Sequence, residues 1–238
     1  STAYEFDLIS EKEGYIAVYP DGYENHWNDC RASADYAANK LNIDDIQFFK
    51  QMVAYFSSKY KIDTDKVFAT GLSNGGHMAY RLALEAPELI SAIAPMAANL
   101  PVDENLDCIK SGKPVSVALF NGTADPINPY NGGLVELFGN TSRGTVLSTD
   151  DTMQYWLSLA SITMLPTSIF HENIDGDTDT QVIQYNWSNG DKDFQLFSLQ
   201  GSGHVIPSKL AHFPKLLGNE AGVISGPEQI VQFFLGEH

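Results

Sequence analysis

The chain has 238 residues, 43% of them hydrophobic, so it is long enough to bury a sizeable core, and its composition does not change abruptly along its length. Its 30 acidic and 14 basic residues give a formal charge of -16, which argues against nucleic acid or an anionic membrane surface as partner, because both would repel it. No apolar run approaches the roughly 20 residues that cross a bilayer. We therefore expect one domain, residues 1–238, without a membrane span.

The first third of the chain predicts two helices and a strand. Residues 3–9 have the pattern of a helix end, and the continuous apolar run 14–19 predicts a buried parallel strand closed by Pro20-Asp21-Gly22. A long loop over residues 23–40 carries a dense group of polar and aromatic side chains, as loops that line sites often do. From residue 44 to 60 apolar residues recur at helical spacing, which predicts a helix packed against the sheet.

Residues 66–80 are typical of a strand, a sharp turn and a helix, with a serine at the turn. The frame Gly71-Leu72-Ser73-Asn74-Gly75 is a G-x-S-x-G, in which the glycines allow a strained turn that lifts the Ser73 hydroxyl off the sheet. At the helix N-terminus the dipole and a free backbone N–H can stabilise an oxyanion. The alternative is a glycine-rich turn without chemistry, but the flanking strand and helix patterns favour a nucleophile elbow.

The rest of the chain continues to alternate strands and helices, which predicts a mostly parallel α/β sheet. The link 188–192 between two late strands is rich in turn residues, so those strands form an antiparallel pair. Ser225-Gly226-Pro227-Glu228 has the capping-box pattern of a closing helix. The expected elements are, in chain order, strands at 90–97 and 114–120, a short helix at 152–160, strands at 182–187 and 194–199, and a helix at 227–235.

A serine nucleophile needs a histidine to take its proton and a carboxylate to orient that histidine, in the chain order serine, acid, histidine. His204 lies in a small-residue loop directly after the strand 194–199, where the base should be. Asp125 follows the strand 114–120 through a short loop, where the acid should be. The competing acids lie in stretches that indicate a helix cap and a loop; they are Asp150, Asp151 and the cluster Asp175-Gly176-Asp177-Thr178-Asp179.

Other candidates have ordinary structural explanations. The aspartate cluster lacks the glutamate of an EF-hand loop, so a polar turn is favoured over calcium, and we expect no metal and no cofactor. His77, one turn into the elbow helix, is expected to serve packing or the surface. Trp27 can line a pocket or cap the core. Cys30 and Cys108 allow either one disulfide or two thiols.

Several motifs together resemble the secreted polyhydroxybutyrate-depolymerase-like and feruloyl or acetylxylan esterases of the α/β-hydrolase superfamily, over nearly the whole chain. These motifs are Trp27-Asn28-Asp29-Cys30-Arg31, Asp44-Asp45, Thr70-Gly71-Leu72-Ser73-Asn74-Gly75-Gly76, Asn121-Gly122-Thr123-Ala124-Asp125-Pro126 with Pro129-Tyr130-Asn131-Gly132-Gly133, and Gly201-Ser202-Gly203-His204.

The resemblance implies an α/β-hydrolase fold with a mostly parallel central sheet and helices on both faces. It implies Ser73 as nucleophile, Asp125 as acid and His204 as base, with the backbone N–H of Asn74 as one oxyanion donor. We also expect Trp27, Tyr130 and Ile206 to contact a small-molecule or polymeric ester, although Ile206 lies where the family usually has a tryptophan. The likeness further implies that the protein is secreted or periplasmic.

The resemblance also implies strands before residue 14 and a His-Gly loop that gives the second oxyanion donor. One of those strands lies between the run 14–19 and the strand 67–70 in the family, and its absence would expose two strand edges. We therefore expect that the chain lacks its first strands, and that an upstream segment or a second chain completes the sheet.

The predicted function is a serine carboxylic-ester hydrolase that acts through an acyl-enzyme on short-chain acyl, hydroxyalkanoate or plant-polysaccharide-linked (feruloyl or acetyl) esters. Within hydrolases, the alternative is a peptidase or lactonase on the same fold. From other classes, the alternatives are a binding protein that has lost catalysis, and a calcium-stabilised carbohydrate-binding module that rests on the aspartate cluster and on tryptophans that are expected to be exposed.

Overall fold

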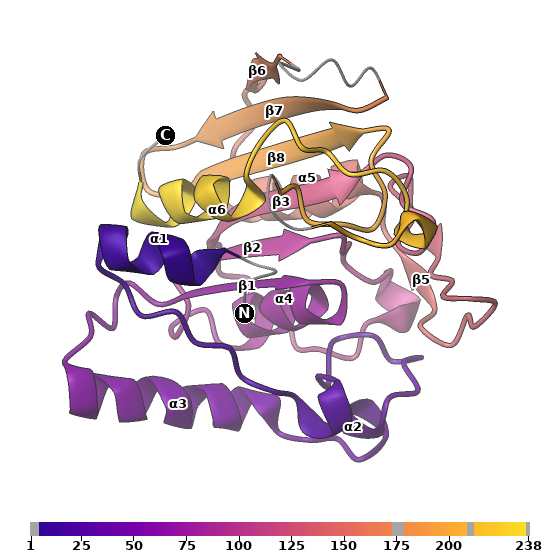
Figure 1. Ribbon diagram of the computed structural model, residues 1–238. Helices are drawn as coiled ribbons and strands as arrows, with labels where there is room; N and C mark the ends of the chain where they lie inside the picture. Colours follow the sequence, from indigo (N-terminus) through magenta and orange to yellow (C-terminus); the bar gives the residue numbers. More distant parts are fainter. Residues whose placement is uncertain (1–4, 173–178, 209–211, 237–238) are drawn as a thin grey trace.

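The computed structural model describes residues 5–172, 179–208 and 212–236 (Figure 1). Its centre is a six-stranded sheet in the order β1-β2-β3-β8-β7-β6, parallel from β1 to β8 and antiparallel for the last two pairs. A short antiparallel pair, β4–β5, lies apart from it. The strands are β1 (Phe68–Leu72), β2 (Ala92–Met96), β3 (Ser116–Gly122), β4 (Gly133–Leu134), β5 (Thr145–Val146), β6 (Thr167–His171), β7 (Gln181–Ser188) and β8 (Asp193–Gln200).

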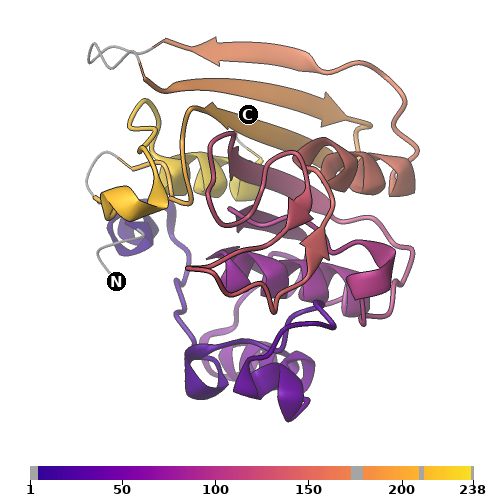
Figure 2. The same ribbon diagram turned by 90° about the vertical axis from the view of Figure 1, so that its right-hand side faces the viewer.

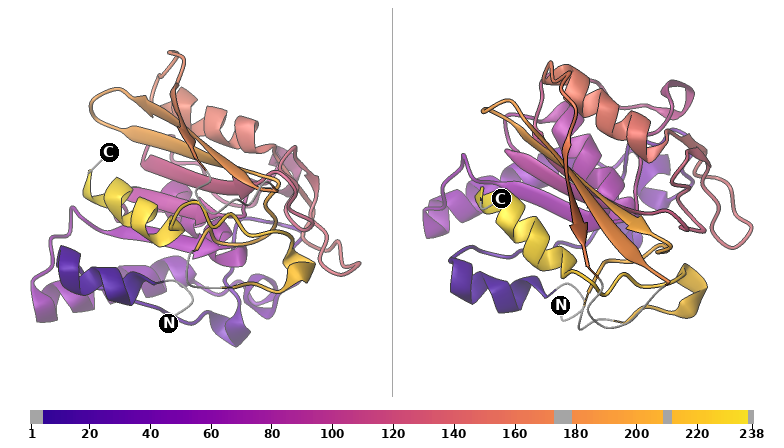
Figure 3. Two further views of the ribbon diagram at one scale, coloured as in Figure 1. Left: turned by 45° about the horizontal axis from the view of Figure 1, so that its top comes forward. Right: turned by 90° about the horizontal axis from the view of Figure 1, so that it is seen from above.

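Helices cover both faces of the sheet, as seen from above in Figure 3. The elements α1 and α6 pack on one face, and α3, α4 and α5 pack on the other. The α-helices are α1 (Phe6–Glu13), α2 (Ala37–Lys40), α3 (Asp45–Tyr60), α4 (Asn74–Glu85), α5 (Thr149–Leu159) and α6 (Gly226–Leu235), and the 3-10 turns are η1 (Tyr23–Asn25), η2 (Asp103–Asn105) and η3 (Lys215–Leu217).

The core has two parts, one on each face of the sheet, and β3 contributes to both. Val117 and Leu119 point into the part that contains α4 and α5, while Ala118 and Phe120 point into the part that contains α6. Successive side chains of a strand face opposite sides, so a central parallel strand is apolar along its whole length. This is why the continuous apolar runs in the sequence predicted β2 and β3, and both predictions are confirmed within two residues at each end.

The predicted helices and the late hairpin are also confirmed. Asp44 caps α3 by accepting a hydrogen bond from Gln47 N at 2.9 Å, and Ser225 caps α6 by accepting one from Glu228 N at 3.3 Å. The hairpin β7–β8 closes through the turn that we expected after Ser188. The edge strand β6 was not predicted, because four of its five side chains are exposed and carry no core pattern.

The prediction of a buried parallel strand at residues 14–19 is wrong. Within the described residues no strand forms a β-ladder with this run, and β1 is the last strand on that side of the sheet. Tyr15 and Ala17 pack against the core part that contains α6, while Ile16 and Val18 are 47% and 41% exposed. An apolar run becomes a strand only where a neighbour supplies backbone partners. The helix before it is α1, which ends at Glu13 with Gly14 as its C-cap, later than the end expected at residue 9.

A disulfide joins Cys30 to Cys108, with Cα atoms 5.1 Å apart, and decides between the two states that the sequence left open. Backbone hydrogen bonds flank it, from Asp107 N to Cys30 O at 3.1 Å and from Ala32 N to Asn105 O at 2.8 Å. The long loop after residue 22 is therefore fastened to the segment that follows β2. None of the described helices is long and apolar enough to cross a membrane.

Candidate active site

Three sequence-predicted residues follow the carboxyl ends of parallel strands. Ser73 follows β1, Asp125 follows β3 and His204 follows β8. Figure 2 looks onto the side of the molecule where these strands end and where the β4–β5 pair lies. Parallel strands bring their carboxyl ends to one edge of the sheet, so Ser73 and His204 meet there although they are 131 positions apart in the sequence.

Ser73 occupies the strained turn that the sequence predicted. Its φ of 56° and ψ of -117° are unusual for a residue with a side chain, and its backbone N donates to Met96 O at 2.9 Å. A Cβ on Gly71 would lie 2.5 Å from the backbone of Gly75, so only glycine allows this close turn. The nucleophile elbow is therefore formed, with Ser73 directly before the first residue of α4.

Asp125 and His204 form a buried pair. His204 Nδ1 and Asp125 Oδ2 lie 2.8 Å apart, and the two side chains are 6% and 1% exposed. The other carboxylate oxygen, Oδ1, accepts from Ile127 N at 2.7 Å and from Asn128 N at 2.9 Å. These backbone donors fix the carboxylate, and the carboxylate in turn fixes the orientation of the imidazole.

Close backbone contact holds the end of β3, from which the Asp125 loop leaves, against the loop that carries His204. A Cβ on Gly122, the last residue of β3, would lie 2.3 Å from Ser202 O. His204 N donates to Leu217 O at 2.6 Å, which anchors the histidine loop to η3. Gly201 and Gly203 are also required, because a Cβ on them would lie 2.2 Å from Asp179 O and 1.9 Å from Leu217 O, respectively.

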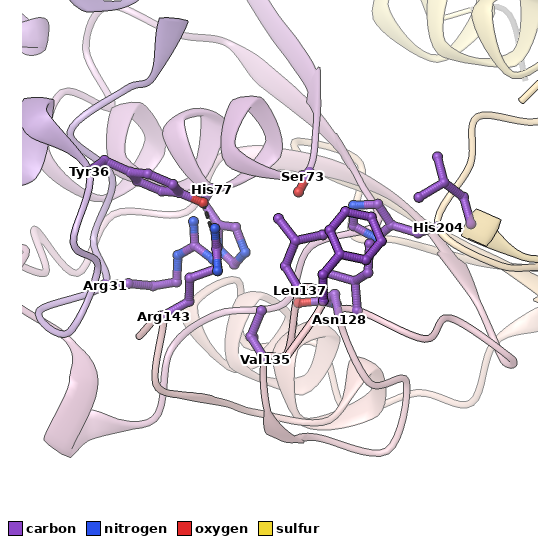
Figure 4. Close-up of a pocket in the computed structure, with 12 residues that line it drawn as sticks. Arg31, Tyr36, Ser73, His77, Asn128, Val135, Leu137, Arg143 and His204 are labelled. Atoms are coloured by element: carbon purple, nitrogen blue, oxygen red, sulfur yellow. Dashed lines mark hydrogen bonds between the residues drawn. The ribbon is translucent and has the colours of Figure 1, made fainter. Parts of the chain in front are cut away.

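Ser73 and His204 line one cavity of about 210 Å³ (Figure 4). The hydrogen bonds of the described residues do not include one between the Ser73 hydroxyl and His204. Catalytic hydrogen bonds are often long before substrate binds, so this geometry fits a resting site. The side chains of Ser73 and His204, predicted as nucleophile and base, therefore border the same cavity.

Asn74 begins α4 and ties the elbow to the preceding loop. Its side chain accepts from Trp27 N at 2.7 Å and donates to Asp29 Oδ2 at 2.6 Å. The first N–H groups of a helix have no acceptor within the helix, so the backbone N–H of Asn74 is placed to donate beside Ser73.

A buried ion pair lies behind the cavity. Asp29 and Arg31 are almost fully buried and pair at 2.5 Å. Burial opposes ionisation of Asp29, but the charge and hydrogen bonds of Arg31 hold the pKa of Asp29 below its ordinary value of 3.8. Both side chains therefore stay ionised, and their opposite charges cancel inside the protein.

His77 also lines the cavity, four residues after Ser73 on the same face of α4. It is 2% exposed, and its Nδ1 has no hydrogen-bond partner among the described residues. Burial lowers the pKa of His77 well below its ordinary value of 6.5, and the nearby charge of Arg31 lowers it further. The sequence predicted a packing or surface role; the residue is in fact a buried, neutral imidazole beside the nucleophile.

His77 is expected to make the protein less stable in acid. Below pH 6.5 the unfolded chain binds a proton that the folded chain does not, so the free energy of unfolding falls as pH falls. One such group contributes about 1.4 kcal/mol per pH unit. Urea unfolding of wild type and His77→Gln between pH 7.5 and 5 should give a shallower pH dependence for the variant.

The control for this measurement is His212→Gln, because the His212 side chain is 83% exposed. This variant should keep the wild-type slope. Equal slopes for wild type and His77→Gln would contradict a neutral buried imidazole.

The three predicted substrate contacts lie outside the residues that line the cavity. Trp27 packs against Phe49 with ring centroids 5.2 Å apart. Tyr130 is half-buried and shares a hydrogen bond with Ser198 Oγ at 2.8 Å, and Ile206 is buried in the core part that contains α6. The structure thus brings together the predicted triad but not these three side chains.

Sequence reasoning missed most of the cavity wall. Between Asp125 and α5 the chain supplies an apolar side, and the long loop and α4 supply a polar side. The loop was singled out in the sequence, but the segment between β4 and β5 carries no periodic pattern that would have marked it. The missed lining residues are Arg31, Tyr36, His77, Ile127, Asn128, Val135, Leu137, Phe138, Arg143 and Leu217.

Within the described part of the chain no group of three or more histidine, cysteine or acidic side chains is arranged to hold a metal ion. Residues 175–178 of the aspartate cluster lie outside that part, and so does His238.

The sequence matches the model of the dienelactone hydrolase family over residues 7–138, more than half of the chain and a stretch that contains Ser73 and Asp125. Feruloyl esterase B of Piromyces equi is 25% identical over 199 residues, which are 81% of this chain and 34% of the relative. Feruloyl esterase B of Talaromyces stipitatus is 26% identical over 229 residues, 87% of this chain and 60% of the relative.

The chain thus spans between about a third and three fifths of these curated relatives. Among solved structures, an acetyl xylan esterase from Aspergillus awamori has a similar fold, with a TM-score of 0.56 and 17% sequence identity over all of this chain and 83% of that one. The match of the family model, together with the mostly parallel sheet and helices of the α/β-hydrolase type, shows that this chain belongs to the dienelactone hydrolase family.

Proposed function

We propose that the protein is a serine carboxylic-ester hydrolase that acts through an acyl-enzyme. The observation that carries the proposal is the buried hydrogen bond between Asp125 and His204, beside the same cavity as Ser73 on its strained turn. The pair orients a base, and the turn exposes a nucleophile at a helix N-terminus. Together they have the parts of a nucleophilic triad.

In the proposed reaction the Asp125 carboxylate accepts the Nδ1–H of His204, which leaves Nε2 free to act as base. Nε2 takes the proton of Ser73 while Oγ attacks the ester carbonyl, and the backbone N–H of Asn74 donates to the oxyanion that forms. His204 then protonates the departing alcohol. A water molecule, deprotonated by His204, attacks the acyl-enzyme and releases the acid and Ser73.

The substrate class is proposed from the relatives. Two are named feruloyl esterases and a protein of similar fold is named an acetyl xylan esterase, so feruloyl or acetyl esters of plant polysaccharides are the first substrates to test. Short-chain acyl and hydroxyalkanoate esters share the same chemistry. The buried disulfide supports an oxidising compartment, in agreement with secretion.

The second oxyanion donor stays a prediction from the sequence, as does a further segment or chain that completes the sheet. What supports the further segment or chain is the position of β1 at the edge of the sheet and the exposure of Ile16 and Val18 in the run 14–19.

The test is the intact mass of the protein before and after a fluorophosphonate, with Ser73→Ala treated in parallel. One phosphonyl adduct on wild type and none on the variant is the expected result. An adduct that persists in Ser73→Ala, or none on wild type, would remove Ser73 as an activated nucleophile. Turnover of an amide analogue alongside the ester would instead favour a peptidase.

A further inference from the structure

Arg143 is a buried cation without an acidic partner in the wall of the cavity. It lies between β4 and β5 and is 8% exposed. Its Nε donates to the Tyr36 hydroxyl at 2.7 Å, its Nη1 reaches Asn140 O at 3.4 Å, and its guanidinium lies over the Tyr36 ring. The described contacts include no ion pair for Arg143 and no acceptor for its Nη2. A buried guanidinium normally has a carboxylate beside it.

No neighbouring group neutralises Arg143. The other arginine of the cavity, Arg31, is already paired with Asp29, and burial keeps His77 neutral. Asp35 is close enough for Arg143 to contribute to lowering its pKa, but this carboxylate accepts from Ser142 Oγ and is exposed to solvent. Among the described residues the Arg143 guanidinium therefore has no ion-pair partner, in a protein whose formal charge is -16.

Asn128 supplies a second unmet polar group in the same cavity. It is 2% exposed, its backbone N donates to Asp125, and neither its Nδ2 nor its Oδ1 has a hydrogen-bond partner among the described residues. Leaving buried amide atoms without partners is costly. Its Nδ2 can donate to a molecule bound in the cavity, and so can the Nη2 of Arg143.

The rest of the wall suits a short carbon chain. Val135, Leu137 and Phe138 form an apolar side, and Figure 4 shows Arg143 and Tyr36 on one side of Ser73 and His204 on the other. At about 210 Å³ the cavity is smaller than sites for drug-sized ligands. A substrate that spans it would place its reacting carbonyl at Ser73 and its far end at Arg143.

We propose that the enzyme selects esters whose acyl chain ends in a carboxylate, the half-esters of short dicarboxylic acids, and that Arg143 binds this carboxylate. The planar guanidinium donates two parallel hydrogen bonds to a carboxylate, which a lysine cannot reproduce. The reaction itself is the proposed ester hydrolysis: water is added, the diacid and the alcohol leave, and no other reactant is needed. The inference therefore rests on the proposed function and specifies its acyl group.

The test compares monomethyl succinate, glutarate and adipate with methyl butyrate, valerate and hexanoate, which have the same chain lengths without the carboxylate. Hydrolysis is followed by proton release in a pH-stat. For wild type, kcat/KM should be at least about 10-fold higher for the best half-ester than for its neutral match. Arg143→Met should lower kcat/KM for half-esters by about 10- to 150-fold and leave neutral esters within about threefold. For half-esters, kcat/KM of Arg143→Lys should lie between the values for wild type and Arg143→Met.

Neutral-ester hydrolysis by Arg143→Met shows whether the variant has folded with an intact triad. Lys110→Met is the matched control, because it removes an exposed positive charge that pairs with Asp103 far from the cavity lining. Equal losses on both ester series would mean that Arg143 only supports the fold, and would overturn the proposal. So would a wild type without preference for half-esters.

A measurement on wild type alone gives an independent check. Glutarate should inhibit hydrolysis of methyl valerate competitively, and valerate should inhibit at least about 10-fold more weakly; equal inhibition would contradict the carboxylate site. If no methyl ester is hydrolysed and no phosphonate adduct forms, the proposed function itself fails. If neutral esters are hydrolysed through Ser73 without dependence on Arg143, only this inference fails.

Discussion

Replacing Ser73 by alanine is expected to lower kcat/KM for ester hydrolysis by about 10⁴- to 10⁶-fold, because it removes the hydroxyl that forms the proposed acyl-enzyme. The residue lies on its strained turn beside His204, whose orientation is fixed by Asp125. The measurement is the hydrolysis rate of a phenyl acetate under conditions that detect one part in 10⁶ of the wild-type rate.

Alanine keeps the Cβ of Ser73, so the turn with φ of 56° costs the same in both proteins. The melting temperature of the variant should therefore stay close to that of wild type, which separates lost chemistry from lost folding. A well-folded Ser73→Ala with more than about a tenth of the wild-type activity would exclude the nucleophile assignment.

Loss of the Cys30–Cys108 disulfide is expected to lower the free energy of unfolding by about 4 kcal/mol. The bond joins residues that are 78 positions apart. In the chain-entropy model, a loop of this length lowers the entropy of the unfolded chain enough to stabilise the fold by about 4.5 kcal/mol. Both cysteines are buried, so their replacement also removes packing. The measurement is urea unfolding of wild type and of the double variant Cys30→Ala/Cys108→Ala.

Unfolding of wild type with and without a reductant gives the control, because it breaks the bond without changing any side-chain carbon. The double variant with and without reductant should show no difference. A loss below about 1 kcal/mol in both experiments would mean that the surrounding hydrogen bonds alone hold the loop.

The sequence was informative where local chemistry determines structure. Ser73 was predicted because a strand pattern precedes it and a helix pattern follows it, and because the tight turn between them demands Gly71, where a Cβ would lie 2.5 Å from the backbone of Gly75. Asp125 and His204 were predicted because each follows, through a short loop, a run of residues that indicates a strand. These signals lie within about ten residues of the group that they identify.

The rest of the site depends on contacts between distant residues. Arg143 meets Tyr36 across 107 positions, and no local pattern encodes that contact. Trp27 was expected to line a pocket, but the aromatic residues of α3 offer it a packing surface that only the folded chain reveals. The apolar run 14–19 failed as a strand for the same reason: its pattern indicates apolar side chains, but not whether a neighbouring strand is present to pair with it.

The short pair β4–β5 gives the enzyme a way to change its substrates. Leu134 and Thr145 are directly paired across the two strands, so the segment between them leaves and re-enters the fold at one place. This segment carries much of the apolar wall and Arg143, whereas the triad lies wholly outside it. Selection, or a designer, can therefore exchange residues 135–144 as a single cassette and recruit a new acyl group while the catalytic machinery is inherited unchanged.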